Sequence, residues 1–300
     1  MKSIEWRRFG PLYLLMAPGL AWFLVYRYAP MAGIVMAFKN FNLTKGIFGS
    51  PWADPIYKHF LAFFTSPYFG QLMSNTLLIS LGKMVFSIGP SLVLAILLSE
   101  CRNPAFKKIV QTVTYLPHFL SWVIIYAIFY ALLTQNGGLI STFVNRATGK
   151  NIEFLADPQW FKPLLYISES WQSAGWGAVI FLAAIAGIDP QLYEAATIDG
   201  ATRFQRVRHI TFPAIATVFV FVLVTRVGRV MDAGFDHVFN FYNQRVYSTG
   251  DIIDTWVFRV GLEQMRYSLG SAVGLFKSII GFVLVVATNR VARKFGRGIW

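Results

Sequence analysis

Charged residues are scarce in this sequence. Asp, Glu, Lys and Arg make up 14% of its 300 residues, whereas soluble globular chains carry about 25%. Hydrophobic residues make up 55%, and the mean hydropathy is +0.51. This composition excludes an ordinary soluble domain and predicts an integral membrane protein. The net charge of +13 then needs no nucleic acid to explain it, because Lys and Arg gather at the cytoplasmic edges of membrane spans.

Several chemical groups are also missing. The single cysteine, Cys101, can form neither an internal disulfide nor a cysteine-rich metal site. The histidines do not occur at metal-binding spacings, and the sequence has no glycine-rich phosphate loop with its lysine. Paired acids, or a nucleophile with its base, are not found at membrane depth. We therefore expect no metal, no cofactor, no ATP site and no enzymatic activity in this chain.

Long apolar segments dominate what is present. A helix needs about 20 apolar residues to cross a bilayer, and six segments meet or approach that length. They are residues 9–34, 76–98, 109–133, 163–188, 212–230 and 269–288. The first segment could instead be a removable signal peptide, but it is too long and lacks a clear cleavage site. The pattern predicts an all-α membrane protein with six spans and one domain over residues 1–300.

The segments between the spans alternate in charge. Four of them are short and together carry 13 Lys and Arg, namely residues 1–10, 99–108, 189–211 and 289–300. Three are longer and carry only nine, namely residues 36–75, 134–162 and 231–268. Positively charged loops stay on the cytoplasmic side. The short set, including both termini, is therefore predicted to be cytoplasmic.

The stretch YEAATIDGATRFQRVRHITFPAI is polar and basic, although it lies between two apolar spans. Asp189 and Pro190 are typical of a helix N-cap followed by a first-turn proline. Gly200 is suited to the left-handed residue that ends a helix. The predicted structure is a short helix, a glycine turn and a second basic turn or helix. Alternatively, the loop could lie on the membrane surface, with lipid headgroups bound by Arg203, Arg206 and Arg208.

The same stretch resembles the EAA loop of ABC importer permeases. The family pattern is E-A-A, three residues, G, nine residues, I, one residue, and L-P. The matching residues here are Glu194, Ala195, Ala196, Gly200, Ile210 and Pro213, and only the Leu is replaced, by Phe212. The segments LPHFLSWV, NTLLIS, FKKIVQTVTYLP and NGGLI resemble carbohydrate permeases of the LplB and maltose types, and a permease subunit of the bacterial alginate importer.

The resemblance implies a six-span ABC importer permease fold with a cytoplasmic coupling helix in residues 189–211. It further implies a bacterial inner-membrane location and a second permease subunit, expected to form a heterodimer. Two cytoplasmic ATPase subunits would hold ATP and Mg, and an extracytoplasmic solute-binding protein would deliver a saccharide. The residues expected to couple to the ATPase are Glu194, Ala195, Ala196, Asp199, Gly200, Ile210 and Pro213.

Ionisable residues within spans are costly and are therefore candidates for function. The predicted topology places five of them in the outer half of the membrane, near polar and aromatic residues that suit a sugar. The candidates for a substrate path are Lys83, Glu169, Trp171, Gln172, Trp176, Arg226, Arg229, Asp232 and Lys277. Spacings of three place Arg226, Arg229 and Asp232 on one helix face. Alternatively, Arg229 and Lys277 reach the outer interface, and Arg229 pairs with Asp232.

The charges within the spans are mainly positive. Lys83, Arg226, Arg229 and Lys277 outnumber Glu169, although nearby aspartates reduce the excess. Unpaired cations would be costly beside a neutral sugar but would bind a carboxylated one, which predicts an acidic substrate such as a uronate oligomer. The alternative function is a secondary transporter, which would need carboxylates near the midplane.

Overall fold

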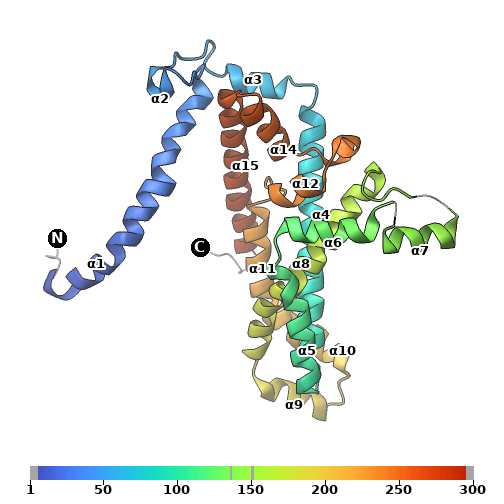
Figure 1. The fold of residues 1–300 in the computed structure, drawn as a ribbon. Helices are drawn as coiled ribbons and strands as arrows, with labels where there is room; N and C mark the ends of the chain where they lie inside the picture. Colours follow the sequence, from blue (N-terminus) through green and yellow to red (C-terminus); the bar gives the residue numbers. More distant parts are fainter. Residues whose placement is uncertain (1–5, 136, 150–151, 295–300) are drawn as a thin grey trace. The chain divides into compact units, whose positions relative to one another are not determined.

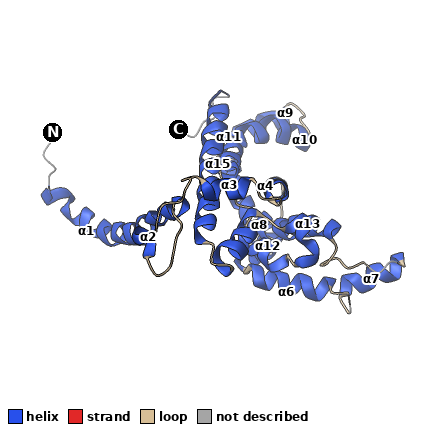
Figure 2. Cartoon of the chain, turned by 90° about the horizontal axis from the view of Figure 1, so that it is seen from above, coloured by secondary structure: helices blue, strands red, loops and turns tan. Residues whose placement is uncertain are grey.

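The computed structural model describes residues 6–135, 137–149 and 152–294, and within them the fold is helical without β-strands (Figures 1 and 2). By internal contacts the chain divides into two units. In the described part, the first unit holds residues 6–66 and 257–276, and the second holds residues 67–256 and 277–294. The single domain predicted from the sequence stays a prediction.

The first unit contains the N-terminal helix and several short helices. Its elements are α1 (Trp6–Phe23), η1 (Leu24–Tyr28), η2 (Ala29–Phe38), α2 (Gly46–Gly49), α3 (Lys58–Phe64), η6 (Phe258–Glu263) and the first part of α15 (Tyr267–Lys294). The helical run Phe9–Phe38 buries none of its most apolar 18-residue window. Its apolar side chains are therefore available to lipid or to another subunit.

The second unit contains the remaining elements. These are α4 (Phe69–Ser99), α5 (Pro104–Tyr115), η3 (Leu116–Phe119), α6 (Trp122–Leu133), α7 (Leu139–Thr148), α8 (Pro158–Ala186), α9 (Pro190–Ile198), α10 (Arg203–Arg206), η4 (Val207–Thr211), α11 (Phe212–Val227), α12 (Phe235–Phe241), η5 (Gln244–Val246), α13 (Tyr247–Gly250), α14 (Ile253–Val257) and the rest of α15.

Helices α4 and α8 pack closely because small residues line their contact. A Cβ on Gly82 would lie 2.2 Å from the Tyr166 ring, and one on Gly177 would lie 2.2 Å from Ser91 Oγ. The Tyr166 hydroxyl in turn donates to the carbonyl of Leu78 at 2.9 Å. Small residues are the usual way for membrane helices to approach. This contact gives the second unit a fixed pair of helices on which polar side chains can be positioned.

Four described helical runs are long and apolar enough to cross a membrane. They are Phe9–Phe38, Phe69–Ser99, Arg203–Val227 and Tyr267–Lys294. Two bent helix pairs also qualify when each is taken as one span, which raises the number to six. The six-span prediction is compatible with this count, but the helices extend beyond the predicted bounds at several ends.

The predicted span 109–133 is not one helix. The chain bends by 106° between Pro104–Phe119 and Trp122–Leu133. Leu120 is extended, with φ −82° and ψ 137°, and Ser121 then caps α6 by accepting from the Ile124 N–H at 3.4 Å. Pro117 in η3 lacks an N–H to continue the helical ladder. A break followed by a new cap therefore replaces the continuous span.

The predicted span 212–230 also ends early. Helix α11 stops at Val227, and the residues after it form turns in which the Arg229 N–H bonds the Arg226 carbonyl and the Asp232 N–H bonds the Arg229 carbonyl. The prediction that Arg226, Arg229 and Asp232 share one helix face is therefore wrong. Arg226 lies in the last turn of α11, and the other two follow it in the turn.

Candidate functional site

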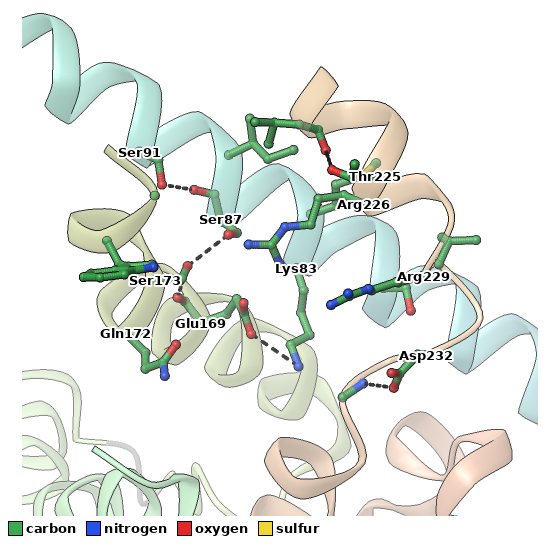
Figure 3. A pocket seen from close by; sticks show the side chains of 18 of the residues that line it. Lys83, Ser87, Ser91, Glu169, Gln172, Ser173, Thr225, Arg226, Arg229 and Asp232 are labelled. Carbon is green, nitrogen blue, oxygen red and sulfur yellow. Dashed lines mark hydrogen bonds and ion pairs between the residues drawn. The ribbon is translucent and has the colours of Figure 1, made fainter. Parts of the chain in front are cut away.

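A cavity of about 530 Å³ lies within the second unit (Figure 3). Its walls come from α4, η3, α8, α11, the start of α6 and the turn after α11. The volume falls within the range of small-molecule sites, about 300–1,000 Å³. Seven of the nine predicted substrate-path residues line it, namely Lys83, Glu169, Gln172, Trp176, Arg226, Arg229 and Asp232.

Two predicted candidates do not line this cavity. Trp171 lies with its ring 6.3 Å from that of Phe129. Lys277 forms an ion pair with Asp254 of α14. The structure therefore separates these two side chains from the cavity, and it gives Lys277 a carboxylate partner instead of leaving it to reach the interface alone.

One wall of the cavity is a polar stripe on α4. Ser80, Lys83, Ser87 and Ser91 occur three or four residues apart, which places them on one helix face, and all four are buried. Ser173 of α8 donates to Ser87 Oγ at 3.0 Å. The stripe shows how a long apolar helix provides hydroxyls to an interior cavity. These serines were not predicted from the sequence, although their spacing from Lys83 was a usable signal.

Lys83 belongs to a buried ionic cluster formed with Glu169 and His237. The Lys83 ammonium lies 3.3 Å from Glu169 Oε2, and His237 Nδ1 lies 3.4 Å from the same oxygen. Lys83 also donates to the carbonyl of Ala233 at 3.0 Å. Lys83 and Glu169 are each only 8% exposed. The ammonium is therefore held by two oxygen partners and faces little solvent.

The surroundings of this cluster fix its geometry. His237 Nε2 lies 2.8 Å from Ser168 Oγ, and the His237 ring stacks on Trp122 at 3.5 Å with an interplanar angle of 6°. Gly234 has a φ of +79°, and a Cβ there would lie 2.7 Å from Lys83 Nζ. Glycine is needed at this position for both the backbone conformation and the close approach. Sequence reasoning missed Trp122 and His237, because nothing local links them to Glu169.

The two cavity arginines differ from Lys83. Arg226 and Arg229 are exposed, and Figure 3 shows both side chains directed towards the cavity. Neither has a carboxylate within 4.0 Å among the residues that the structure describes. Asp232 instead accepts from the Gly234 N–H at 3.1 Å. The alternative pairing of Arg229 with Asp232 is therefore absent, and the two guanidinium groups remain free to bind a ligand.

An aromatic wall lies on another side of the cavity. The Trp176 ring stacks on the His118 ring at 4.8 Å with an interplanar angle of 2°. Gln172 donates to the carbonyl of His118 at 3.5 Å. Trp176 remains exposed, and its ring offers an apolar face beside polar side chains. The His118 Nδ1 is buried and has no hydrogen-bond partner in the described part of the chain.

The loop between α8 and α11 has the predicted local structure. Asp189 Oδ1 accepts from the Gln191 N–H at 2.9 Å at the start of α9. Gly200 follows the helix with a φ of +78°, and Thr202 and Gln205 form a capping box at α10. These contacts confirm the helix, the glycine turn and the second helical segment. The second segment continues through η4 into α11, so Pro213 lies in the first turn of α11.

Side-chain contacts make this loop one rigid piece. Arg206 Nη1 donates to Thr197 Oγ1 at 2.7 Å, and the Tyr193 hydroxyl lies 2.9 Å from Thr211 Oγ1. A shallow pocket of about 320 Å³ lies between α9 and the following segment, and its lining includes Ala196, Asp199, Gly200 and Ile210. Glu194 and Ala195 are exposed. A rigid element of this kind can transmit force, and the coupling role of its residues stays a prediction.

The loop also carries apolar residues that the sequence analysis did not select. Ile198 is 87% exposed and Phe204 is 72% exposed. Both side chains are therefore available for contact with another subunit. The signal was present in the sequence as two bulky apolar residues within a charged segment.

The described residues contain no group of three or more His, Cys, Asp or Glu side chains that could hold a metal ion. The cavity offers binding groups for a polar ligand. The loop between α8 and α11 offers exposed apolar side chains for contact with another protein.

Comparison with known proteins gives consistent matches. The model of the family described as "Binding-protein-dependent transport system inner membrane component" matches residues 88–300. A polygalacturonan/rhamnogalacturonan transport system permease protein of Bacillus subtilis is 44% identical over 95% of this chain and 88% of its own length. Protein LplB of the same organism is 40% identical over 98% of this chain and 93% of its own length.

Solved structures agree with these matches. A chain of a bacterial ABC transporter involved in the import of the acidic polysaccharide alginate superposes with a TM-score of 0.89 and 34% identity, over 97% of both chains. A chain of the bacterial alginate ABC transporter in complex with an alginate pentasaccharide-bound periplasmic protein gives a TM-score of 0.88 and 33% identity, over 98% of both.

Proposed function

Because this chain belongs to the family of binding-protein-dependent transport system inner membrane components, we propose that it is the permease subunit of an importer for acidic oligo- or polysaccharides. It is a multi-pass membrane protein and not an enzyme. ATP would be bound, with Mg, and hydrolysed by two separate cytoplasmic subunits that dock on the loop 189–211. A second, different permease subunit would complete the path in the bacterial inner membrane, with both termini of this chain cytoplasmic.

The proposal of an acidic substrate depends on two arginines in the cavity that have no carboxylate partner in the described chain. Arg226 and Arg229 face the cavity without a carboxylate partner in the described chain. Keeping charges at membrane depth is costly unless a partner offsets the cost. A sugar carboxylate can accept two parallel hydrogen bonds from a guanidinium group, which a neutral hydroxyl cannot match.

The named substrates of two relatives support this proposal. One relative is named for polygalacturonan and rhamnogalacturonan, and a structural neighbour imports alginate, described as an acidic polysaccharide. Galacturonan chains also carry carboxylates on their sugar rings. The exposed Trp176 ring in the same cavity would pack on the apolar face of a sugar ring.

The test compares uptake of acidic and neutral oligosaccharides of equal length by the assembled transporter in proteoliposomes. Acidic substrates should be taken up by the wild type. Arg226→Gln should raise the KM for them by about 10-fold or more, since a hydrogen bond to a charged group contributes about 1.5–3 kcal/mol. Arg146→Gln serves as a control, because Arg146 is exposed on α7 and does not line the cavity. Full uptake of neutral sugars with none of acidic ones would reject the proposal.

A further inference from the structure

The two outer segments of the first unit meet at one buried serine. Ser268 Oγ donates to the Lys39 carbonyl at 2.7 Å and accepts from the Phe41 N–H at 2.9 Å. His59 Nε2 donates to the same Lys39 carbonyl at 3.0 Å. Residues 39–41, 59 and 268 are separated in the sequence, yet these bonds fix them together. The outer part of this unit therefore has a defined surface and is not a set of independent loops.

A pocket of about 410 Å³ lies on this surface. It is lined by residues from 40–42, 58–62 and 265–269, and we name it the outer basic pocket. Lys58 and Arg266 line it, and both are exposed. Burial lowers the pKa of His59, and the charges of Lys58 and Arg266 lower it further against the effect of its backbone bond. Both cations therefore act on one ring from positions around the same pocket.

The two cations of the outer basic pocket are unpaired in the part of the chain that the structure describes. Lys58 and Arg266 have no carboxylate within 4.0 Å among the described residues. The first unit has only two described acidic residues, Asp54 and Glu263, and neither lines the pocket. Folding of this unit thus leaves an uncompensated positive charge at a formed concave site.

Lys39 shows the contrast within the same unit. Its ammonium donates to the carbonyls of Ile47 and Phe48 at 3.0 and 2.9 Å, and the residue is buried. Lys39 therefore stabilises the loop itself. Among the described residues, Lys58 and Arg266 make no such bonds, so their charges are available to a partner outside the chain.

We propose that the outer basic pocket receives an acidic side chain of the extracytoplasmic solute-binding protein. The inference rests on the proposed function, which places these segments outside the membrane. They lie between the first two apolar helices and before the last one, where the charge pattern predicts the outer side. Charged groups at the rim of an interface speed association and fix orientation. A protein carboxylate fits better than a sugar carboxylate, because the lining of the translocation cavity includes none of these residues.

The experiment measures the affinity of the cognate binding protein for the whole transporter in nanodiscs at several salt concentrations. The variant is Lys58→Gln with Arg266→Gln. Two exposed ion pairs contribute about 0.2–1 kcal/mol each, so the Kd should rise by about 2- to 30-fold, and its salt dependence should weaken. The ATPase rate at saturating binding protein should equal that of the wild type. Lys45→Gln is the matched control, since Lys45 is exposed on the same outer segment but outside the pocket, and it should change nothing.

A charge reversal, Lys58→Glu with Arg266→Glu, should weaken binding more than the neutral variant does. Equal Kd values and equal salt slopes in the wild type and both variants would overturn the inference. A raised KM for acidic oligosaccharides with an unchanged Kd for the binding protein would also overturn it, because the pocket would then hold sugar. If the wild-type transporter took up neutral sugars and no acidic ones, the proposed substrate would be refuted. The measured affinities for the binding protein would still decide whether the outer basic pocket receives it.

Discussion

The buried ionic cluster of Lys83, Glu169 and His237 allows a decisive mutational test. Lys83→Met and Glu169→Gln each remove one charge of a pair whose atoms lie 3.3 Å apart at 8% exposure. Each change leaves the opposite charge buried without its partner. Breaking a buried pair in this way costs about 3–5 kcal/mol. Each single variant should therefore lose about that much stability.

The double variant Lys83→Met/Glu169→Gln should be much milder. It removes both charges together, and the amide that replaces the carboxylate keeps a polar oxygen beside His237 Nδ1. What is lost is mainly the Lys83 bond to the Ala233 carbonyl, a term of about 0.5–1.5 kcal/mol. The two single losses would sum to about 6–10 kcal/mol. The expected coupling energy, which is the difference between that sum and the loss in the double variant, is thus at least about 4.5 kcal/mol, above the range of about 0.5–3 kcal/mol usual for residues in contact.

Thermal unfolding of the purified transporter in detergent is the assay. A loss of 1 kcal/mol lowers Tm by about 2–4 °C for a chain of 150–250 residues, so the single variants should differ clearly from the double one. Arg226→Gln is the control, because Arg226 is exposed and unpaired in the described chain, and its Tm should stay near that of the wild type. A double variant as unstable as the summed single variants would refute the reasoning. A stable double variant that has lost acidic-sugar uptake would show that the Lys83–Glu169 pair is needed for transport as well as for stability.

Three further outcomes follow from the coupling loop and the topology. Gly200→Val should uncouple ATP hydrolysis from uptake, because the φ of +78° at Gly200 is costly for a β-branched residue, whereas Gly200→Asn should retain coupling. The measurement is the amount of sugar taken up per ATP hydrolysed, and coupled transport by the Val variant would contradict the role of this turn. Ile198→Asp and Phe204→Asp should reduce co-purification of the ATPase subunits without lowering membrane insertion, which pull-down from detergent measures; unchanged recovery would show that these exposed side chains do not dock. A reporter that is active only in the cytoplasm should be active when fused to the C-terminus, and one that is active only in the periplasm should not. Activity of the periplasmic reporter would overturn the proposed orientation.

Features set by neighbouring residues were predictable from the sequence. Asp189 and Pro190 start α9, and Gly200 ends it, because caps depend on the chemistry of one or two adjacent residues. The same holds for the presence of the apolar helices, which follows from long hydrophobic runs, although the ends of these helices differ from the predicted bounds. The comparisons confirm the family that the EAA pattern had indicated.

Features set by distant residues were not predictable. The pairing of Lys83 with Glu169, and the stacking of His237 on Trp122, join segments that no local pattern connects. The break after Pro117 was also missed, because proline is tolerated in membrane helices when the freed groups find other partners. Here Ser121 supplies a new cap, so a break is more favourable than a kink.

The structure changes the meaning of the positive charge in the spans. The sequence suggested four similar cations, but Lys83 pairs with Glu169, and Lys277 pairs with Asp254. Those two lysines therefore contribute little net charge to a ligand. The remaining excess comes from Arg226 and Arg229, which face one cavity, with Asp232 engaged by a backbone N–H. An acidic substrate thus depends on which cations remain unpaired and where they lie, and not on the total charge of the spans.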